Sequence, residues 1–192
     1  MEKKEVINFF DNLADGWDAE QIPKDAIIEK IFDNGGVETG KDILDVACGT
    51  GTLFPFYFKR KVKSVTGIDI SSEMVKIAKK KFPEIEIICG DAEEYHFDEK
   101  FDIIMIYNAF PHFPNPEKLI KNLAEYLKDN GRISVAHSMS RAEIQIRHQK
   151  RASNVSLELP TAEDLAEMLS PYFDIDVIIS DDEMYQVSGI KK

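Results

Sequence analysis

The stretch "ILDVACGTG", Ile43–Gly51, decides the fold of this chain. Its first residues are an apolar run broken by a single acid, which is typical of a strand buried on both faces of a sheet. Glycines directly after a strand indicate that the backbone turns sharply or that a ligand approaches it closely. Both interpretations place this segment at the carboxyl end of a strand in an open α/β sheet, the edge where such sheets bind ligands.

The composition is that of one globular domain that is long enough to fold without disulfide bonds or a structural metal. The chain has 192 residues, of which 43% are hydrophobic and 31% charged, and its net charge of −11 repels phosphate backbones, so we expect no nucleic-acid partner. No run approaches the roughly 18 apolar residues of a membrane span, and the first residues lack the apolar stretch of a signal peptide. The two cysteines, Cys48 and Cys89, have no metal-ligand or disulfide-framework spacing. We therefore expect a cytoplasmic protein that does not bind membranes.

Strand-like and helix-like segments alternate along most of the chain. The apolar runs 42–47, 64–70, 85–90, 101–108 and 132–137 have helical patterns between them, the last of which, over 116–129, is expected to end at Asn130-Gly131. Such repetition predicts a doubly wound, mostly parallel sheet with helices on both faces. Two further strands, 173–180 and 183–190, joined by the two residues Asp181-Asp182, predict a C-terminal antiparallel hairpin and seven strands in all.

The same patterns divide the single domain into four parts. Residues 1–36 are expected to form a cap of two helices, and residues 37–137 the ligand-binding core. Residues 138–160 form an insertion in which the capping box Ser140–Glu143 predicts a helix from Arg141. Residues 161–192 supply a helix opened by Thr161 and the hairpin.

Three acids, Asp45, Asp69 and Asp91, follow three successive strands. Because the carboxyl ends of parallel strands lie on one edge, the three carboxylates are expected to share a rim. An acid about twenty residues beyond a glycine turn can accept both hydroxyls of a ribose, and Asp69 lies 18 residues after Gly51 (69 − 51). Asp45 can face a positively charged tail, and Asp91 a purine amine. The pattern predicts a nucleoside-binding rim.

These segments, in this order, resemble the class I S-adenosylmethionine-dependent methyltransferases, in particular the small-molecule branch with type 11 and type 25 domains. The resemblance starts near residue 37 and runs through "LDVACGTG", "TGIDIS", "GDAEEYHF" and the unit 101–135 to the closing hairpin. It implies S-adenosylmethionine as cofactor and methyl transfer to a small-molecule acceptor by in-line displacement. The cofactor-binding residues that it implies are Trp17, Asp45, Ala47, Cys48, Gly49, Gly51, Asp69, Ile70, Asp91, Ala92, Tyr107 and Asn108. Ala47 stands where the family often has glycine.

Two other functions remain open at this point. A nicotinamide-dependent dehydrogenase would need Gly-x-Gly-x-x-Gly to hold a pyrophosphate on a helix N-terminus, whereas this chain has Ala-x-Gly-x-Gly-Thr and a hairpin foreign to that fold. A protein that binds the cofactor without catalysis has the same motifs, and a binding titration combined with a turnover assay separates it from an enzyme.

The acceptor side of the site is expected above the ends of the fourth and fifth strands. His112 and His137 are candidate catalytic groups there, since imidazole can take a proton near neutral pH. As an alternative, His112, His137 and His148 together could hold a metal ion in a metal-assisted transferase. The insertion 138–160 is basic, and this is typical either of anion recognition on the acceptor or of a solvated helix face. Phe10 and Trp17 are expected to shield the reacting sulfur.

Overall fold

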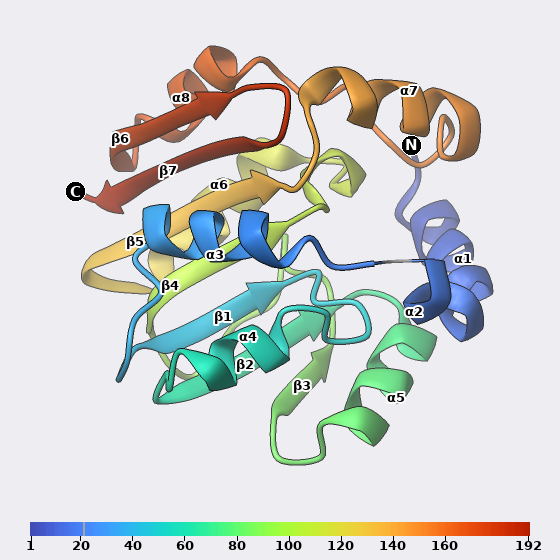
Figure 1. The fold of residues 1–192 in the computed structure, drawn as a ribbon, viewed down its shortest axis with the longest axis horizontal. Coiled ribbons are helices and arrows are strands. Elements are labelled where there is room, and N and C mark those ends of the chain that lie inside the picture. The colour runs from blue at the N-terminus through green and yellow to red at the C-terminus, as the bar shows by residue number, and fades with distance from the viewer. Residues whose placement is uncertain (21) are drawn as a thin grey trace.

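One mixed sheet of seven strands organises the computed structural model, which describes residues 1–20 and 22–192 (Figure 1). The strand order is β3-β2-β1-β4-β5-β7-β6. Pairing is parallel from β3 through β5, and β7 runs antiparallel to both β5 and β6. This confirms the predicted fold class. The strands are β1 Asp42–Val46, β2 Ser64–Asp69, β3 Glu86–Cys89, β4 Phe101–Tyr107, β5 Leu127–His137, β6 Phe173–Ser180 and β7 Tyr185–Lys191.

Helices cover both faces of the sheet. Ile43 of β1 packs with α3, α4 and α5 on one face, while the next residue, Leu44, packs with α6 and α8 on the other. This alternation is the two-residue period of a strand, and it explains why the first strand is apolar throughout. The helices are α1 Lys3–Leu13, α2 Trp17–Glu20, α3 Asp25–Asn34, α4 Phe54–Lys59, α5 Ser72–Lys81, α6 Pro116–Glu125, α7 Arg141–Arg151 and α8 Ala162–Leu169, with 3-10 turns Ala14–Gly16 and Phe110–His112.

Helix α6 ends earlier than predicted. It stops at Glu125, and the chain enters β5 at Leu127, which is fully buried and pairs with Phe101. The Asn130-Gly131 pair, expected to end the helix, lies within β5, where Asn130 has a positive φ of 58° and the register of the pairing shifts. Burial of Leu127 in the sheet outweighs the helical pattern of the segment.

The predicted two-residue turn of the C-terminal hairpin is wrong. Ser180 pairs with Tyr185, so four residues form the connection. The Asp181 carboxylate accepts the backbone N–H groups of Glu183 and Met184 at 2.9 and 2.8 Å, which builds the turn from a side chain. Met184 is fully buried, and its place in the core sets where the return strand begins.

The carboxyl edge of the sheet lies under a cover made from two distant parts of the chain. Helices α1 and α2 stand beside this edge next to α5, and α7 lies above it (Figure 1). Val6 of α1 packs against Ala152 and Val155, which follow α7. As predicted, α7 begins at Arg141 after a capping box on Ser140. Over residues 1–20 and 22–36, the N-terminal segment contains three helices and a 3-10 turn rather than the two helices expected.

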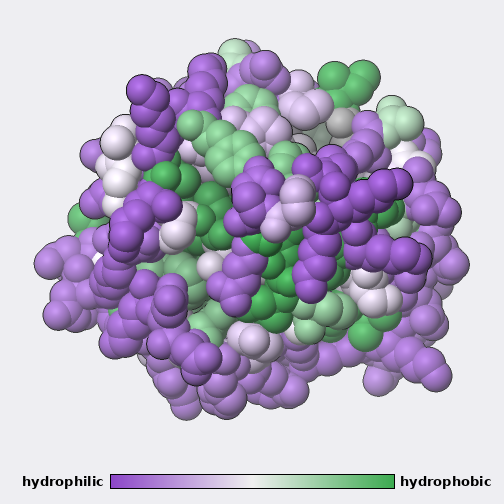
Figure 2. Space-filling model, turned by 90° about the horizontal axis from the view of Figure 1, so that it is seen from below, coloured by the Kyte–Doolittle hydropathy of each residue, from purple (hydrophilic) through white to green (hydrophobic). Residues whose placement is uncertain are grey.

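Polar side chains cover most of the face seen from below in Figure 1, with apolar side chains visible between them (Figure 2). An apolar contribution of this kind is normal for protein surfaces. Across residues 1–20 and 22–192, no helix combines the length and the apolar character that crossing a membrane requires.

Candidate functional site

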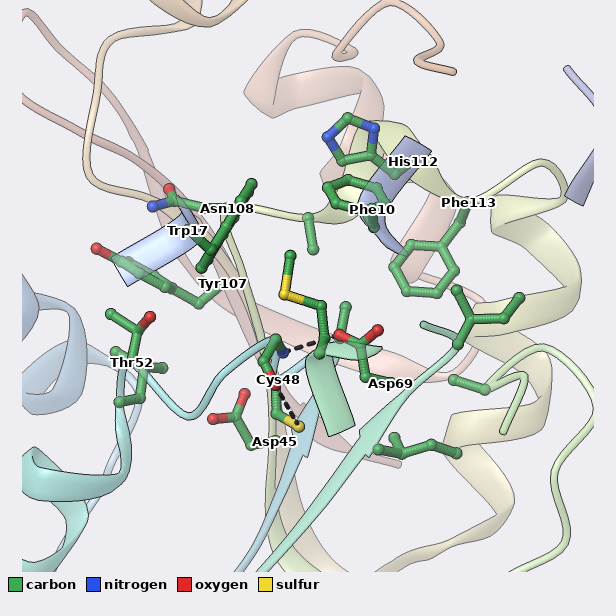
Figure 3. A pocket seen from close by; sticks show the side chains of 18 of the residues that line it. Phe10, Trp17, Asp45, Cys48, Thr52, Asp69, Tyr107, Asn108, His112 and Phe113 are labelled. Carbon is green, nitrogen blue, oxygen red and sulfur yellow. Dashed lines mark hydrogen bonds between the residues drawn. The ribbon is translucent and has the colours of Figure 1, made fainter. Parts of the chain in front are cut away.

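A cavity of about 310 Å³ opens at the carboxyl ends of β1, β2 and β4, beneath the N-terminal helices (Figure 3). Its volume falls in the range of small-molecule sites. The three predicted rim acids, Asp45, Asp69 and Asp91, all line it. The successive strands therefore deliver one carboxylate each to a single cavity.

Asp69 joins two segments of the cavity wall. One carboxylate oxygen accepts the N–H of Gly49 at 2.8 Å, and the other accepts the N–H of Ser71 at 2.8 Å. Burial raises the pKa of Asp69 to about 6, although the two backbone donors partly oppose this shift. A carboxylate offers about four acceptor positions, so each oxygen keeps one for a ligand. This arrangement suits a pair of neighbouring hydroxyl groups.

Asp45 is buried and one of its oxygens, Oδ2, has no hydrogen-bond partner. Burial, together with the charge of Asp69, raises the pKa of Asp45 well above its usual range. An unpartnered carboxylate oxygen in a buried position is unfavourable unless a donor reaches it. Asp45 lines the cavity, but its Oδ2 atom is buried beneath the cavity surface.

Asp91, the third rim acid, is already engaged by the protein. Its Oδ1 accepts the N–H of Glu93 at 2.9 Å, and its Oδ2 forms an ion pair with Lys3 of α1. The Lys3 ammonium also lies 3.0 Å from the Glu93 carboxylate. The N-terminal helix thus reaches directly to the rim, and Lys3 is itself part of the cavity lining.

Two further side chains hold the N-terminal helices to the rim. Asp11 of α1 accepts the hydroxyl of Ser71 at 2.6 Å and the N–H of Glu73 at 3.1 Å, at the start of α5. Asp18 of α2 accepts the hydroxyl of Thr50 in the glycine loop. With Lys3 on Asp91, each segment that follows β1, β2 and β3 is held by one residue of the cover.

The glycine loop has left-handed backbone at alternate positions. Ala47, Gly49 and Gly51 have φ values of 56°, 55° and 86°. Gly49 lines the cavity, and a side chain there would meet only Trp17, at 3.7 Å. Gly51, predicted to bind the cofactor, is not among the lining residues, and a Cβ there would lie 2.6 Å from Phe54. Position 51 therefore requires glycine because the ring of Phe54 packs closely against it.

The other predicted cofactor-binding residues all line the cavity. Asn108, which follows β4, is joined to the end of β5: its Oδ1 accepts the N–H of Ser138 at 3.0 Å. Burial raises the pKa of the Cys48 thiol well above its usual range, which keeps it protonated and unsuited to nucleophilic attack. The predicted residues at the cavity wall, besides the three acids, are Trp17, Ala47, Cys48, Gly49, Ile70, Ala92, Tyr107 and Asn108.

His112 lines the cavity and His137 does not. The Nδ1 atom of His112 lies 2.7 Å from the carbonyl oxygen of Val155, so it donates its proton there, and burial lowers the pKa of this imidazole to about 4. His137 is 1% exposed and packs against Tyr185, with ring centroids 5.9 Å apart. His137 therefore lies in the packed core next to the cavity rather than in its wall, and a role for it toward the substrate stays a prediction.

The histidines do not assemble the metal site considered from the sequence. The rings of His112 and His148 lie 4.9 Å apart, but Nδ1 of His112 is taken by a backbone carbonyl. Within the described part of the chain, no three histidine, cysteine or acidic side chains are grouped so as to hold a metal ion.

Several residues that line the cavity are not predicted from the sequence. Lys3 belongs to no motif, and only the fold brings it to Asp91. Phe113 follows His112 directly and has its ring at the cavity (Figure 3), a position that the neighbouring histidine could have suggested. Met139 lines the cavity from the segment between β5 and α7.

Comparison with known proteins finds similarity to methyltransferases. A sequence model described as a methyltransferase domain matches residues 43–131. The malonyl-[acyl-carrier protein] O-methyltransferase of Priestia megaterium is 38% identical over 92 residues, covering 46% of this chain and 34% of that protein. The ubiquinone biosynthesis O-methyltransferase of Coxiella burnetii is 30% identical over 143 residues, covering 69% and 61%. These similarities support the class I S-adenosylmethionine-dependent methyltransferases as the family of this chain.

The predicted resemblance to this family is therefore confirmed. The chain spans 34% and 61% of the lengths of the two methyltransferases named above. Among solved structures, the magnesium protoporphyrin IX methyltransferase of Synechocystis PCC 6803 superposes with a TM-score of 0.74 at 17% identity. That enzyme was solved with bound S-adenosyl-L-homocysteine (SAH). That match covers 99% of each chain and extends the shared methyltransferase fold beyond residues 43–131.

The two loop glycines differ in what a methyl group would disturb. Gly51→Ala places a Cβ against Phe54 in a left-handed backbone, and we expect a loss of about 3 kcal/mol in the free energy of unfolding. For Gly49→Ala we expect a loss of only about 1 kcal/mol in the free energy of unfolding, because the left-handed backbone is strained but the new Cβ makes no close contact. Urea denaturation measures both. Equal losses for the two variants would contradict the assignment of Gly51 to packing.

The raised pKa of Asp69 should make the free energy of unfolding depend on pH. Its pKa in the folded protein, about 6, is higher than the ordinary value of 3.8, so the fold favours the protonated form. That contribution is fully present below pH 4 and is lost as the pH rises through 6. Relative to Asp69→Asn, the unfolding free energy of the native sequence should fall by about 2–3 kcal/mol between pH 4 and 7. Denaturant titrations at these pH values measure it, and a pH-independent difference would count against the shifted pKa.

Proposed function

We propose that this protein transfers a methyl group from S-adenosylmethionine to a small-molecule acceptor. The observation that carries the proposal is the set of three carboxylates, from the ends of three successive strands, on one cavity. The names of the two sequence relatives, both O-methyltransferases, and the SAH bound to the Synechocystis enzyme support it.

The residues of the cavity fit this cofactor. Asp69 keeps one acceptor position on each oxygen, which matches the two hydroxyls of a ribose. The Asp45 carboxylate, which lines the cavity, can face the ammonium of the methionine part. Ile70 and Ala92 offer apolar contact for a purine beside Asp91. When bound, S-adenosylmethionine supplies an electrophilic methyl group on a sulfonium.

The chain's own contribution is alignment and exclusion of water. Phe10 and Trp17, from the N-terminal segment, line the cavity with their rings edge to face, 5.8 Å between centroids. Asp11 and Asp18 hold these helices in place through Ser71 and the glycine loop. An ordered site of this kind raises the rate of methyl transfer because it aligns donor and acceptor and keeps water away from them.

His112 is the histidine in the cavity wall. Its Nδ1 donates to Val155, so the neutral ring holds its lone pair on Nε2. Because the lowered pKa of about 4 makes this imidazole a weak base, it suits accepting a hydrogen bond from a hydroxyl or an amine of the acceptor rather than removing its proton at pH 7. His137, which is buried and is not part of the cavity wall, is not given this role.

The first test is cofactor binding by calorimetry. Asp69→Ala should raise the dissociation constant of S-adenosylmethionine at least tenfold, about 1.4 kcal/mol, because the paired hydroxyl hydrogen bonds are lost. Asp98→Ala, which removes an exposed acid outside the cavity lining, is the matched control and should leave the affinity unchanged.

Unchanged affinity in Asp69→Ala, or tight binding of a nicotinamide dinucleotide in place of S-adenosylmethionine, would contradict the proposal. Denaturation curves of both variants show whether each is folded. Binding without release of SAH across a panel of acceptors would indicate the non-catalytic alternative.

A further inference from the structure

Among the residues that the structure describes, Arg147 differs from the other arginines in having no acidic partner. Among the described residues its guanidinium meets no carboxylate within salt-bridge distance, and its Nη1 lies 2.9 Å from the sulfur of Met139. A thioether is a weak acceptor, so most of the five donors of the guanidinium remain available. The other four arginines, each paired with a carboxylate, are Arg60, Arg132, Arg141 and Arg151.

Arg147 is also the arginine that lines the cavity. It belongs to α7, which follows β5, whereas the rim acids follow β1, β2 and β3. In the sheet, β4 and β1 separate β5 from β2, so Arg147 lies on the side opposite the ribose-binding acid. The proposed cofactor occupies the Asp69 side, and this leaves the Arg147 side to the methyl acceptor.

The cavity lining contains a second cation that has no acidic partner, in a chain whose net charge is −11. Lys24 lines the cavity and, within the part of the chain that the structure describes, is in no ion pair. Glu20 lines it too, but its carboxylate lies 3.4 Å from Arg151. An anionic ligand would therefore find an unpaired guanidinium without a competing free carboxylate beside it.

Apolar side chains line the same cavity as Arg147, and one of them, Met139, touches it. Phe10, Trp17 and Met139 line the cavity together with it. A planar guanidinium binds carboxylate and phosphate through two parallel hydrogen bonds, and aromatic and thioether side chains favour an apolar body.

We propose that the methyl acceptor carries an anionic group, a carboxylate or a phosphate, on an apolar body, and that Arg147 binds this group. The inference rests on the proposed function, since it takes the Asp69 side of the cavity for the cofactor. A carboxylate is also present on S-adenosylmethionine itself, so the test has to distinguish the acceptor from the cofactor as the source of the anion.

The experiment uses the full chain saturated with SAH and three probes of similar size: benzoate, phenyl phosphate and benzamide. Calorimetry should show that benzoate or phenyl phosphate binds at least tenfold more tightly than the neutral benzamide. Arg147→Gln should abolish this preference and leave the affinity for SAH within twofold. Lys150→Gln removes a charge from the same helix outside the cavity lining and should change neither.

Each other outcome overturns the proposal. A tenfold loss of SAH affinity in Arg147→Gln would assign the guanidinium to the cofactor. Equal binding of benzamide and the two anions, no binding by any of them, or a preference that survives in Arg147→Gln would show that no anion is recognised there. If the native protein fails to bind SAH at all, the proposed function fails first, and the two failures are thus separated.

Discussion

The two hydrogen bonds accepted by Asp69 are the constraint on which the site depends. They join the N–H of Gly49, in the loop after β1, to the N–H of Ser71, at the start of α5. The loop has left-handed backbone, and a buried carboxylate that receives one of its N–H groups stabilises that shape. The same burial raises the pKa of Asp69, so the fold bears an energetic strain that a ligand donating hydrogen bonds to the charged form would relieve.

The N-terminal helices extend this constraint from the loop to the whole cavity. Lys3, Asp11 and Asp18 each engage one segment at the ends of the first three strands, so the cover and the rim are one polar network. Phe10 and Trp17 close the cavity from this cover. A ligand at the rim and the position of the cover are consequently coupled, because Asp91 cannot change its partner without releasing Lys3.

Much of this fold follows from local sequence patterns. The buried strand 42–46, the capping box at Ser140 and the acids at three strand ends depend on short-range chemistry, and the structure has them where the sequence predicts. Gly51 and His137 depend on tertiary packing instead. The nearest neighbour that a side chain at Gly51 would meet, Phe54, is known only once α4 is placed, and no local pattern separates that requirement from the close approach of a ligand.

The central claim is that the three rim acids bind S-adenosylmethionine, with Asp69 and Asp91 at its adenosine part and Asp45 at its methionine part. A crystal structure of the protein with SAH tests it most directly. The account predicts both ribose hydroxyls within hydrogen-bond distance of the Asp69 carboxylate, and the amino group of the methionine part facing Asp45. A nucleoside bound elsewhere, or a rim left empty at saturating SAH, would contradict it.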